Sequence, residues 1–453
     1  MITLIIDGAS VAIKGDSKQT AVVESLIAPC MSFQPINYQY SEKYKAGEWS
    51  GWIELYDNYQ HRFPRGFLDE VEMILGLSDI EYQVEDRSIY GTKNPLFIET
   101  DHNKLRPYQV DAVNKAVDAQ RGILCMPTGT GKTFTAIEIM RRVGYNTVVF
   151  VHKLELMEQW TEVLMKELGL PRDDIGRVGD GEIVIRPITI AMVQTVSRLP
   201  PQVFNSFGVG IIDECHHVPA DTVFDLATSF RGAHLYGLSA TPFRTDGMDL
   251  KIKGALGSFI INLNLSEMIE AGWLARPTVY LYPVPPATYP RNASYADIYR
   301  DYIVENGKRN LMIRSIVEEH FKAGKSVYVH VRHLAHGRHL KELLPDAVWI
   351  NGQDKLEERT LAIKNFSEKG GVLISDLLGE GIDVPGMDCL VLACGGLSEV
   401  FVRQLIGRVL RVTANKKTVE IVDFKDCCKY LVEHAEAREA LYFSEPAFKM
   451  VNL

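Results

Sequence analysis

Short apolar runs rich in β-branched residues recur along most of this chain and alternate with segments that have the apolar spacing of helices. A first series begins near Leu105, and a second follows a proline-rich stretch. The runs of the first series are residues 122–126, 147–151, 188–191, 209–212 and 235–238. Those of the second series are residues 327–331, 348–350, 372–374, 389–392 and 418–422. Because this alternation is typical of a parallel sheet covered by helices, the chain is predicted to contain two α/β domains.

The chain has 453 residues, which exceeds one ordinary hydrophobic core, and about three domains are expected. Residues 1–98 have weaker strand and helix signals and are predicted to form a small N-terminal α+β domain that binds DNA. The two α/β domains are assigned to residues 99–276 and 277–453. Several prolines fall within residues 273–291. Since proline breaks regular structure, this stretch is predicted to cross between the domains.

Charge and composition exclude several classes of protein. A formal net charge of -9 argues against a protein that coats nucleic acid through bulk positive charge, so a polyanion would need local basic and backbone-donor sites. The seven cysteines lack CxxC and Cys/His ligand spacing, which favours a reducing compartment over a disulfide framework. No run of about 18 apolar residues occurs. No membrane segment is therefore expected, and the protein is predicted to be cytoplasmic.

A phosphate-binding loop is predicted where a strand gives way to a helix, within the sequence Met-Pro-Thr-Gly-Thr-Gly-Lys-Thr that begins at Met126. Glycines let backbone N–H groups approach phosphates, Lys132 adds positive charge at the outer phosphates, and the Thr133 hydroxyl can ligate Mg²⁺. Met126 stands where the first glycine is usual. The expected nucleotide contacts are Pro127, Thr128, Gly129, Thr130, Gly131, Lys132 and Thr133. ATP and Mg²⁺ are the predicted cofactors.

Two carboxylates, Asp213 and Glu214, directly follow the apolar run 209–212, at the sheet edge where α/β proteins bind ligands. Asp213 can hold magnesium, and Glu214 can orient an attacking water. A carboxylate pair alone more often caps a helix or lies in solvent, but together with the phosphate loop it predicts a hydrolysis site. His216 is predicted to couple hydrolysis to movement, with simple packing as the alternative.

A basic helical face is expected near the end of the second series. Gln404, Gly407, Arg408 and Arg411 lie three or four residues apart and share that face. Arginine side chains can clamp a transferring phosphate. A basic surface helix is the alternative, but in a chain with half an ATPase site these residues are predicted to supply the other half. Arg408 and Arg411 are equal candidates for the arginine that senses the outer phosphate.

The N-terminal region contains aromatic and basic residues in alternation between residues 38 and 67. Such interleaving can bind nucleic acid, because bases stack on aromatic rings and cations pair with phosphates. Lys43, Lys45 and Trp49 are the candidate contacts. The alternative is a strand that buries its aromatic side chains.

The ordered set of motifs over residues 104–425 resembles that of the superfamily two helicases. The resemblance implies two tandem RecA-like domains, with parallel sheets flanked by helices, after the small N-terminal α+β domain. It also implies that Arg106 and Gln109 contact adenine and that Ser239 and Thr241 couple hydrolysis to strand movement. Further implied nucleotide contacts are Gly381 and Asp383. Implied contacts with the strand backbone are His152, Lys153, Gln194, Thr195, Asn351, Gly352 and Ser375.

Finer features are similar to the group that contains the nucleotide-excision-repair helicases and the UvsW-like helicases of tailed phages. The Arg-Pro-Tyr-Gln segment at Arg106 and the segment 239–247 carry the first similarity, and residues 44–57 and 63–67 carry the similarity to UvsW-like proteins. This resemblance implies DNA as the partner, and branched substrates such as forks and Holliday junctions in replication, recombination or repair. A phage-encoded protein would act in the host cytoplasm.

The leading hypothesis is therefore an ATP-dependent DNA helicase or translocase that acts on branched DNA. One alternative is a duplex translocase of the restriction-motor type that moves DNA without separating strands. Another is an ATP-gated DNA clamp that hydrolyses too slowly to move. Since one chain can supply both halves of the ATP site, a monomeric motor is expected.

Overall fold

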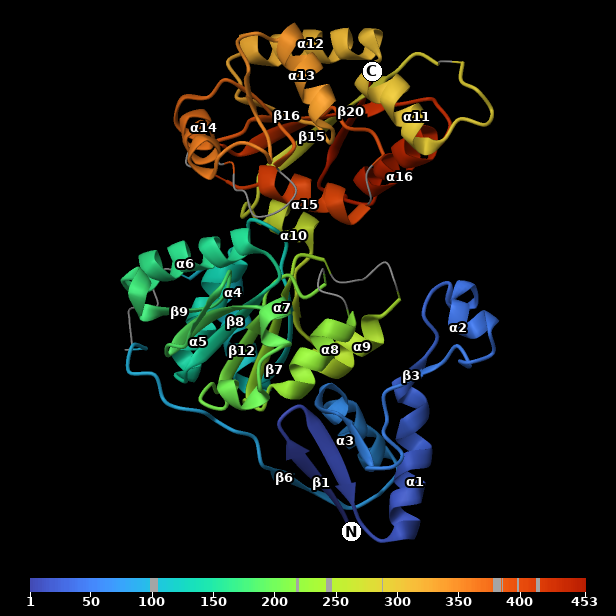
Figure 1. The fold of residues 1–453 in the computed structure, drawn as a ribbon, viewed down its shortest axis with the longest axis vertical. Helices are drawn as coiled ribbons and strands as arrows, with labels where there is room; N and C mark the ends of the chain where they lie inside the picture. The colour runs from blue at the N-terminus through green and yellow to red at the C-terminus, as the bar shows by residue number, and fades with distance from the viewer. Residues whose placement is uncertain are drawn as a thin grey trace. The chain divides into compact units, whose positions relative to one another are not determined.

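The computed structural model describes residues 1–97, 105–216, 220–241, 247–286, 288–377, 384, 386–396, 399–412 and 416–453. The chain divides into two compact units, and Figure 1 traces it by colour. Unit 1 comprises Met1–Met126 and Gly131–Asn262, and unit 2 comprises Pro127–Thr130 and Leu263–Leu453. Each unit contains a large, mainly parallel sheet with helices around it. The predicted pair of tandem α/β folds is thereby confirmed.

The large sheet of unit 1 has the strand order β10-β9-β11-β8-β12-β13-β7-β14. The strands are β7 Arg121–Cys125, β8 Thr147–Val151, β9 Ile175–Gly179, β10 Glu182–Val184, β11 Ile188–Met192, β12 Val209–Ile212, β13 His234–Ser239 and β14 Phe259–Asn262. Among these described strands, β9 and β10 pair antiparallel and the others pair parallel. Strands β7, β8, β12 and β13 are buried throughout, which explains their continuous apolar runs.

Helices cover this sheet and fix the loops at its carboxyl edge. They are α4 Pro107–Ala119, α5 Lys132–Val143, α6 Leu154–Leu168, α7 Val193–Val196, α8 Ala220–Ser229 and α9 Asp249–Leu256. Helix α5 buries Ile137 and Met140 completely, and α6 buries Trp160. These apolar faces hold the first turn of each helix against the end of a central strand.

The N-terminal region has its own sheet, of order β5-β2-β1-β6. Its elements are β1 Ile2–Asp7, β2 Ser10–Lys14, β5 Arg62–Pro64, β6 Tyr82–Asp86, α1 Ser17–Ile27 and α3 Leu68–Leu77. Strand β1 pairs antiparallel with β2 and parallel with β6. A core that includes Leu4, Val11, Phe63 and Val71 lies between the sheet and the helices. The predicted mixed fold of this region is confirmed.

A small lobe projects from the N-terminal region in Figure 1. It contains the two-stranded sheet of β3 Ser32–Phe33 and β4 Ile53–Glu54 and the short helix α2 Glu42–Lys45. The predicted alternation of buried aromatics is only partly present, because Tyr56 is buried while 48% of Trp52 is exposed. The lobe therefore presents aromatic surface that a purely structural strand would hide.

The N-terminal region is fixed to the first α/β fold by close backbone contacts. A Cβ on Gly66 would lie 2.0 Å from the carbonyl oxygen of Lys253, so a glycine is required there. Asp7 pairs with Arg231 at 2.7 Å, and Glu70 pairs with Lys253. We call these contacts, together with the Ser258 hydroxyl that donates to Glu70 at 3.3 Å, the N-terminal seam. Both sides of the seam belong to unit 1.

Unit 2 contains a parallel sheet of order β17-β18-β16-β19-β20-β15-β21. The strands are β15 Arg276–Pro283, β16 Val327–His330, β17 Val348–Ile350, β18 Val372–Ser375, β19 Cys389–Leu392, β20 Thr418–Lys425 and β21 Lys449–Asn452. The helices are α10 Leu265–Glu270, α11 Tyr295–Tyr299, α12 Gly307–Lys322, α13 Leu334–Leu343, α14 Leu356–Lys369, α15 Glu399–Val409 and α16 Leu431–Phe443.

The proline-rich stretch differs from the sequence prediction. Its first part forms β15, which pairs with β20 on one side and β21 on the other. The strand forms because alternate residues, such as Val279 and Leu281, are buried. Pro277 and Pro283 lie near its two ends, where a missing N–H disturbs the ladder least. The expectation that the stretch breaks regular structure from residue 273 onward is therefore wrong.

Two arginine–aspartate pairs are buried in unit 2. Arg309 in α12 donates from Nε and Nη2 to the two carboxylate oxygens of Asp426, at 2.8 and 3.2 Å. Its Nη1 donates to the carbonyl of Ala393 at 2.7 Å. Arg438 in α16 pairs in a similar way with Asp423 at 2.8 and 3.1 Å. Each buried charge is thus paired with an opposite charge. Replacing one partner by a neutral residue would leave the other charge buried and unpaired.

Candidate active site

The predicted phosphate loop joins the buried end of β7 to the first turn of α5. Gly129 and Gly131 have φ values of 89° and 84°, a region that favours glycine. A Cβ on Gly131 would also lie 2.6 Å from Nε2 of Gln109. The turn is shaped further by Thr130, whose hydroxyl donates to the carbonyl of Pro127 at 2.6 Å. The first turn of α5 offers backbone N–H donors, which suits a phosphate group.

Lys132 links the loop to the carboxylate pair. Its Nζ donates to the carbonyl of Met126 at 3.2 Å and lies 3.9 Å from Oε1 of Glu214. The lysine side chain is 10% exposed and the glutamate side chain 21% exposed. The ammonium group is therefore held at the strand ends, and both side chains keep some access to solvent. Thr133 is half-buried in the first turn of the same helix.

Asp213 is buried and held by two donors. The indole Nε1 of Trp160 donates to Oδ2 at 2.7 Å, and the backbone N–H of Glu214 donates to Oδ1 at 3.0 Å. Burial, together with the neighbouring charge of Glu214, raises the pKa of Asp213 to about 6. A cation beside Asp213 would relieve both effects, so the residues present fit the predicted Mg²⁺. Trp160 is 53 residues away in sequence, and no sequence motif pointed to it.

Glu214 has a φ of 47°, which is uncommon for a residue other than glycine. Its Oε2 lies 3.5 Å from Nδ1 of His216, which in turn lies 3.0 Å from Oγ of Ser239. The Ser239 hydroxyl donates to the carbonyl of Thr241, and the Thr241 backbone N–H donates back to it at 3.1 Å. The Ser239 carbonyl accepts from the N–H of Met126 at 2.9 Å. The three predicted coupling residues therefore lie together beside the phosphate loop.

The residues of the predicted adenine motif form the start of α4. Oε1 of Gln109 accepts from the Arg106 backbone N–H at 2.9 Å, and Nη1 of Arg106 donates to the Tyr108 hydroxyl at 3.0 Å. Gln109 is 4% exposed and lies beside Gly131. The structure thus brings this motif next to the phosphate loop.

The residues of unit 1 that are predicted to contact the nucleic-acid backbone lie at the ends of β8 and β11, which are paired in the sheet. His152 and Lys153 follow β8, and Nε2 of Gln194 donates to the His152 carbonyl at 3.0 Å. Gln194 is exposed and Thr195 is half-buried in α7. Burial lowers the pKa of Lys153, the residue that caps the start of α6. These four residues form one polar group at the carboxyl edge of the sheet.

A matching edge occurs in unit 2. Ser375 ends β18, and its Oγ accepts from the N–H of Leu377 at 3.1 Å. Asn351 follows the neighbouring strand β17 and donates from Nδ2 to Asp354 at 3.0 Å, with Gly352 next in the chain. Arg408 lies in the last turn of α15. The predicted sites Gly381 and Asp383 lie outside the described residues, as does the side chain of Gln404.

Arg411 follows α15 and forms an isolated β-bridge with Leu274. The Leu410 carbonyl also accepts from the N–H of Ala275 at 2.7 Å. The backbone of Arg411 is therefore fixed beside the start of β15, while its side chain is half-buried. Arg408 and Arg411 both lie within unit 2, but the prediction that they share one helical face is wrong for Arg411, because α15 ends at Val409 and Arg411 pairs with Leu274 instead.

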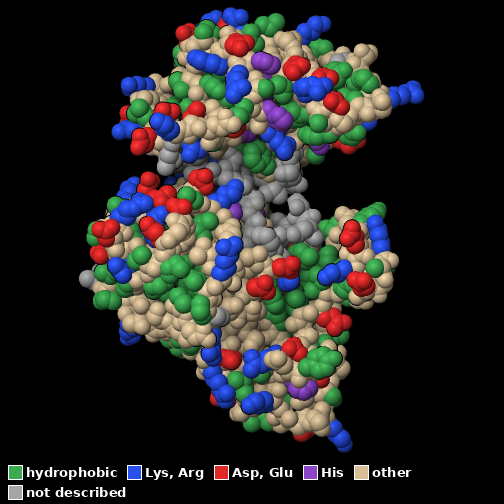
Figure 2. Space-filling view, in the orientation of Figure 1, with side chains coloured by type: hydrophobic (Ala, Val, Ile, Leu, Met, Phe, Trp, Pro, Cys, Tyr) green, Lys and Arg blue, Asp and Glu red, His purple; other side chains and the backbone are tan. Residues whose placement is uncertain are grey.

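The candidate DNA contacts of the N-terminal region lie on the small lobe. Lys43 and Lys45 are exposed on α2, and Nζ of Lys45 lies 5.8 Å from the ring centre of Tyr40. Nε1 of Trp49 donates to the Trp52 carbonyl at 2.7 Å, which fixes its ring. Sequence reasoning left out Tyr40, which is 67% exposed on this lobe. On the visible face of the molecule, Lys and Arg side chains are interspersed with Asp and Glu (Figure 2).

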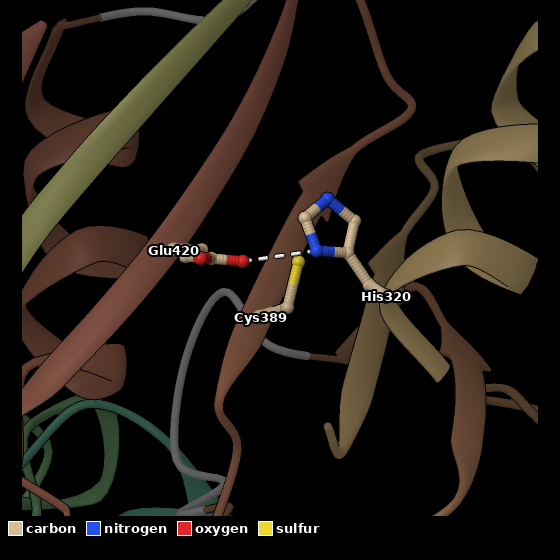
Figure 3. A group of neighbouring side chains, drawn as sticks. All are labelled: His320, Cys389 and Glu420. Atoms are coloured by element: carbon tan, nitrogen blue, oxygen red, sulfur yellow. Dashed lines mark ion pairs between the residues drawn. The ribbon is translucent and has the colours of Figure 1, made fainter. Parts of the chain in front are cut away.

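One group of side chains among the described residues has the spacing of metal ligands, within 4.8 Å of one another. Figure 3 shows His320 and Glu420 facing each other with Cys389 beside them. Nδ1 of His320 lies 2.9 Å from Oε2 of Glu420, and Nζ of Lys325 pairs with the same oxygen. Burial raises the pKa of the Cys389 thiol, which disfavours the thiolate that a metal needs. We therefore assign an ion pair to this group.

When the pH is lowered, unit 2 of the Glu420→Gln variant is expected to lose less stability than unit 2 of the unmodified protein. The hydrogen bond from His320, and after it the contact with Lys325, lowers the pKa of Glu420 to about 2 against the effect of burial. Because this pKa is depressed in the folded state, the pair stabilises the fold above the ordinary carboxyl pKa, and this contribution is lost as pH falls toward 2. Urea denaturation between about pH 6 and pH 3 would measure the difference. Equal pH dependence of Glu420→Gln and the exposed control Glu433→Gln would contradict the assignment.

Family models match both α/β folds in the expected order. The model described as "Type III restriction enzyme, res subunit" matches residues 102–244, and the one described as "Helicase conserved C-terminal domain" matches residues 308–413. The chain is also 32% identical over 345 residues to the "Putative DNA 3'-5' helicase Rad25" of Halobacterium salinarum, covering 74% of this chain and 56% of that protein. The chain therefore carries both conserved domains of the superfamily two helicases, in the predicted order.

Similarity to the "ATP-dependent DNA helicase uvsW" of Enterobacteria phage T4 extends over nearly the whole length of both chains. The two are 24% identical over 476 residues, which covers 93% of this chain and 94% of the phage protein. The predicted resemblance to UvsW-like proteins is thereby confirmed. A fragment of a putative HsdR subunit of a type I restriction enzyme from Vibrio vulnificus has a TM-score of 0.55 at 20% identity, covering 79% of this chain and 70% of that one, and shares the fold.

The chain spans 56% to 65% of the length of three curated relatives, which are two proteins named "Putative DNA 3'-5' helicase Rad25" and the "Putative helicase 22" of Sulfolobus islandicus filamentous virus. Within the part of the chain that the structure describes, no helix is both long and apolar enough to cross a membrane.

Proposed function

We propose that this helicase hydrolyses ATP to move along DNA and remodels branched DNA in replication, recombination or repair. The observation that carries the proposal is the linked set of Lys132, Asp213 and Glu214 at the strand ends, continued through His216 to Ser239. A site that only bound a nucleotide would need the loop and the lysine. The carboxylate pair and its hydrogen-bonded continuation supply what hydrolysis and its coupling need in addition.

In this proposal the chain's own residues bind the nucleotide and position water. Mg²⁺ supplies charge neutralisation at the outer phosphates when bound, and Thr133 and Asp213 would hold it. Lys132 pairs with the outer phosphates, and Glu214 orients the attacking water. The remaining proposed contacts are Arg106, Gln109, Pro127, Thr128, Gly129, Thr130, Gly131, Gly381 and Asp383 for the nucleotide, and Gln404, Arg408 and Arg411 for the transition state.

Ser239 and Thr241 are proposed to couple ATP hydrolysis at the candidate active site to movement of the DNA. A change at Glu214 reaches Ser239 through His216, and Ser239 also bonds to the first residue of the phosphate loop. A hydrogen-bonded set of this kind can adopt different arrangements with and without the outer phosphate, as nucleotide switches do. These residues therefore act as coupling groups in the proposal.

DNA would be held by its backbone at the two polar edges. The proposed contacts are His152, Lys153, Gln194, Thr195, Asn351, Gly352 and Ser375, joined by Lys43, Lys45 and Trp49 on the small lobe. Backbone contacts position a strand without reading its bases, so binding should weaken with salt and show little sequence preference. With both halves of the ATP site in one chain, a monomeric motor acting in the cytoplasm is proposed.

Forked and four-way DNA are expected to stimulate ATP hydrolysis several-fold more than linear duplex, because the lobe adds a second contact beside the motor. Hydrolysis rates on single-stranded, duplex, forked and four-way DNA, and on RNA, would measure this. Lys43→Ala/Lys45→Ala should reduce the stimulation by branched DNA more than that by linear DNA. The exposed pair Lys14→Ala/Lys18→Ala in the same region is the matched control.

Each alternative function has its own outcome in this experiment. Equal stimulation by all DNA forms would contradict the preference for branched DNA and leave the motor in place. DNA-dependent hydrolysis without displacement of a strand from a forked duplex would favour a duplex translocase. Nucleotide-dependent DNA binding without multiple turnover would favour the ATP-gated clamp.

A further inference from the structure

A polar pocket of about 240 Å³ lies along the N-terminal seam, wholly within unit 1. Its polar lining comes from segments far apart in sequence: Arg65, Asp69, Asp86, Gln120, Arg121 and Ser258. Neither the motor motifs nor the candidate DNA contacts include any of these residues. The pocket holds two arginines that are almost completely buried, with Arg65 7% exposed and Arg121 8% exposed.

Arg65 has protein partners for its guanidinium group. Nη1 donates to the Gly8 carbonyl at 3.2 Å and to the Ser88 hydroxyl at 2.7 Å, and Nη2 donates to Oε1 of Gln120 at 3.3 Å. Its nearest carboxylate oxygen, Oδ2 of Asp86, lies 3.9 Å from Nη2. Arg65 is therefore well positioned, but its charge is only loosely matched.

Arg121 lacks such a set of partners. Nη1 donates to the Gly8 carbonyl at 3.3 Å, while Nε and Nη2 are buried and have no hydrogen-bond partner among the described residues. No ion pair within the described part of the chain involves Arg121. Burial, and after it the positive charge of Arg65, lowers the pKa of Arg121 to about 9. At neutral pH the pocket thus holds two buried positive charges that repel each other.

Burying an unpaired charge is costly, and native proteins normally match it with an opposite charge. The Nε and Nη2 edge of a guanidinium group is the edge that binds two oxygens of a phosphate or carboxylate in parallel. A water molecule occupies about 30 Å³ in the liquid, so the pocket has room for a phosphate group and several waters. The pocket lining also includes the carboxylates of Asp69 and Asp86, of which Asp86 lies near Arg65, so it is the free donors of Arg121 and the volume that suit an oxyanion.

We infer that this pocket is a phosphate-binding site in which Arg121 is the principal ligand and Arg65 the second charge. The oxyanion would accept from Nε and Nη2 of Arg121 and would offset the repulsion between the two arginines. Because the pocket lies on the seam, an anion there would also strengthen the attachment of the N-terminal region to the first α/β fold. The phosphate can come from free inorganic phosphate or from the backbone of DNA.

Equilibrium dialysis with labelled inorganic phosphate tests the site in the full-length protein. A saturating non-hydrolysable ATP analogue occupies the phosphate loop, so that binding elsewhere is measured. Arg121→Met, which keeps the length of the side chain and removes its donors, is expected to weaken this binding about tenfold. Arg87→Met, at an exposed arginine outside the pocket, is the matched control and should bind as the unmodified protein does.

A second readout guards against a variant that fails to fold. Arg121→Lys keeps the charge but loses the two-donor edge, and it should show a clearly smaller rise of the thermal midpoint with phosphate, at constant ionic strength, than Arg87→Met. Equal phosphate binding and equal thermal response in Arg121→Met, Arg121→Lys and Arg87→Met would overturn the inference. Such a result would show that phosphate does not bind at Arg121 and that water alone fills the pocket.

A DNA arm identifies the source of the phosphate. If Arg121→Met also weakens DNA binding several-fold and inorganic phosphate competes with DNA at that site, the DNA backbone supplies the ligand. If DNA binding is unchanged while phosphate binding is lost, the ligand is a free anion. Both results support the site. The phosphate arm needs neither ATP hydrolysis nor DNA, so its failure is distinct from a failure of the proposed motor function.

Discussion

Replacement of Glu214 by glutamine is expected to lower DNA-stimulated ATP hydrolysis by about 100- to 1,000-fold. The carboxylate lies 3.9 Å from Nζ of Lys132 and 3.5 Å from Nδ1 of His216, at the point where an attacking water would be held. Glutamine keeps the size of the side chain but removes its negative charge and its ability to take a proton. Binding of ATP should change little, because the phosphate loop and Asp213 are untouched.

Steady-state hydrolysis and equilibrium binding of a fluorescent ATP analogue together test this expectation. Glu162→Gln provides the control. Glu162 is exposed on α6, so this variant should hydrolyse ATP at the normal rate. A Glu214→Gln protein that kept normal hydrolysis would refute the assignment of Glu214. Loss of nucleotide binding together with hydrolysis would instead indicate a structural role for the carboxylate.

Arg309→Ala is expected to destabilise unit 2 by about 3–5 kcal/mol. The side chain is fully buried, its guanidinium makes two bonds with Asp426 and one with Ala393, and its Cζ lies 4.7 Å from the ring centre of Phe424. Truncation leaves a buried carboxylate without its cation and a cavity beside it. Hydrogen exchange of peptides from β19 and β20 under increasing urea would report the loss within unit 2.

A matched control lies in the same helix. Arg314 in α12 is 45% exposed and pairs with Glu318 four residues later, so Arg314→Ala should cost far less stability than Arg309→Ala. The double change Arg309→Met/Asp426→Leu removes both charges and should recover part of the lost stability, because no buried charge is then left unpaired. Equal effects of Arg309→Ala and Arg314→Ala would contradict the importance of the buried pair.

The sequence predicted most strands of the two large sheets because their side chains are buried on both faces. The bounds of β8, β12 and β19, which are buried throughout, agree with the apolar runs at both ends. Those of β17 agree as well, although Val348 in this strand is exposed. Strand β15 was missed because its prolines argue against a strand, whereas the alternate burial of its other residues stabilises it. Tertiary packing thus overrode the local signal.

The candidate site was predicted from motif spacing, and the structure adds contacts that spacing cannot supply. The motifs placed Lys132, Glu214 and Ser239 on separate strand ends, and the parallel order of β7, β12 and β13 brings those ends together. The bond from Trp160 to Asp213 depends on how α6 packs, and no pattern of residue types encodes it. The same holds for the buried donors of Arg121, since burial depends on a contact with a distant segment.

During synthesis, the N-terminal seam can form only after both of its sides have left the ribosome. The contact between Glu70 and Ser258 joins residues 188 positions apart. At about 5–20 residues per second, roughly 10–40 s of translation separate the two sides of this contact. During that interval the N-terminal sheet can close on its own, since β1, β2, β5 and β6 all lie within its first 86 residues. The surface at Gly66 that packs against α9 stays exposed to solvent until α9 has left the ribosome. During this interval the nascent chain is most open to contacts with other proteins.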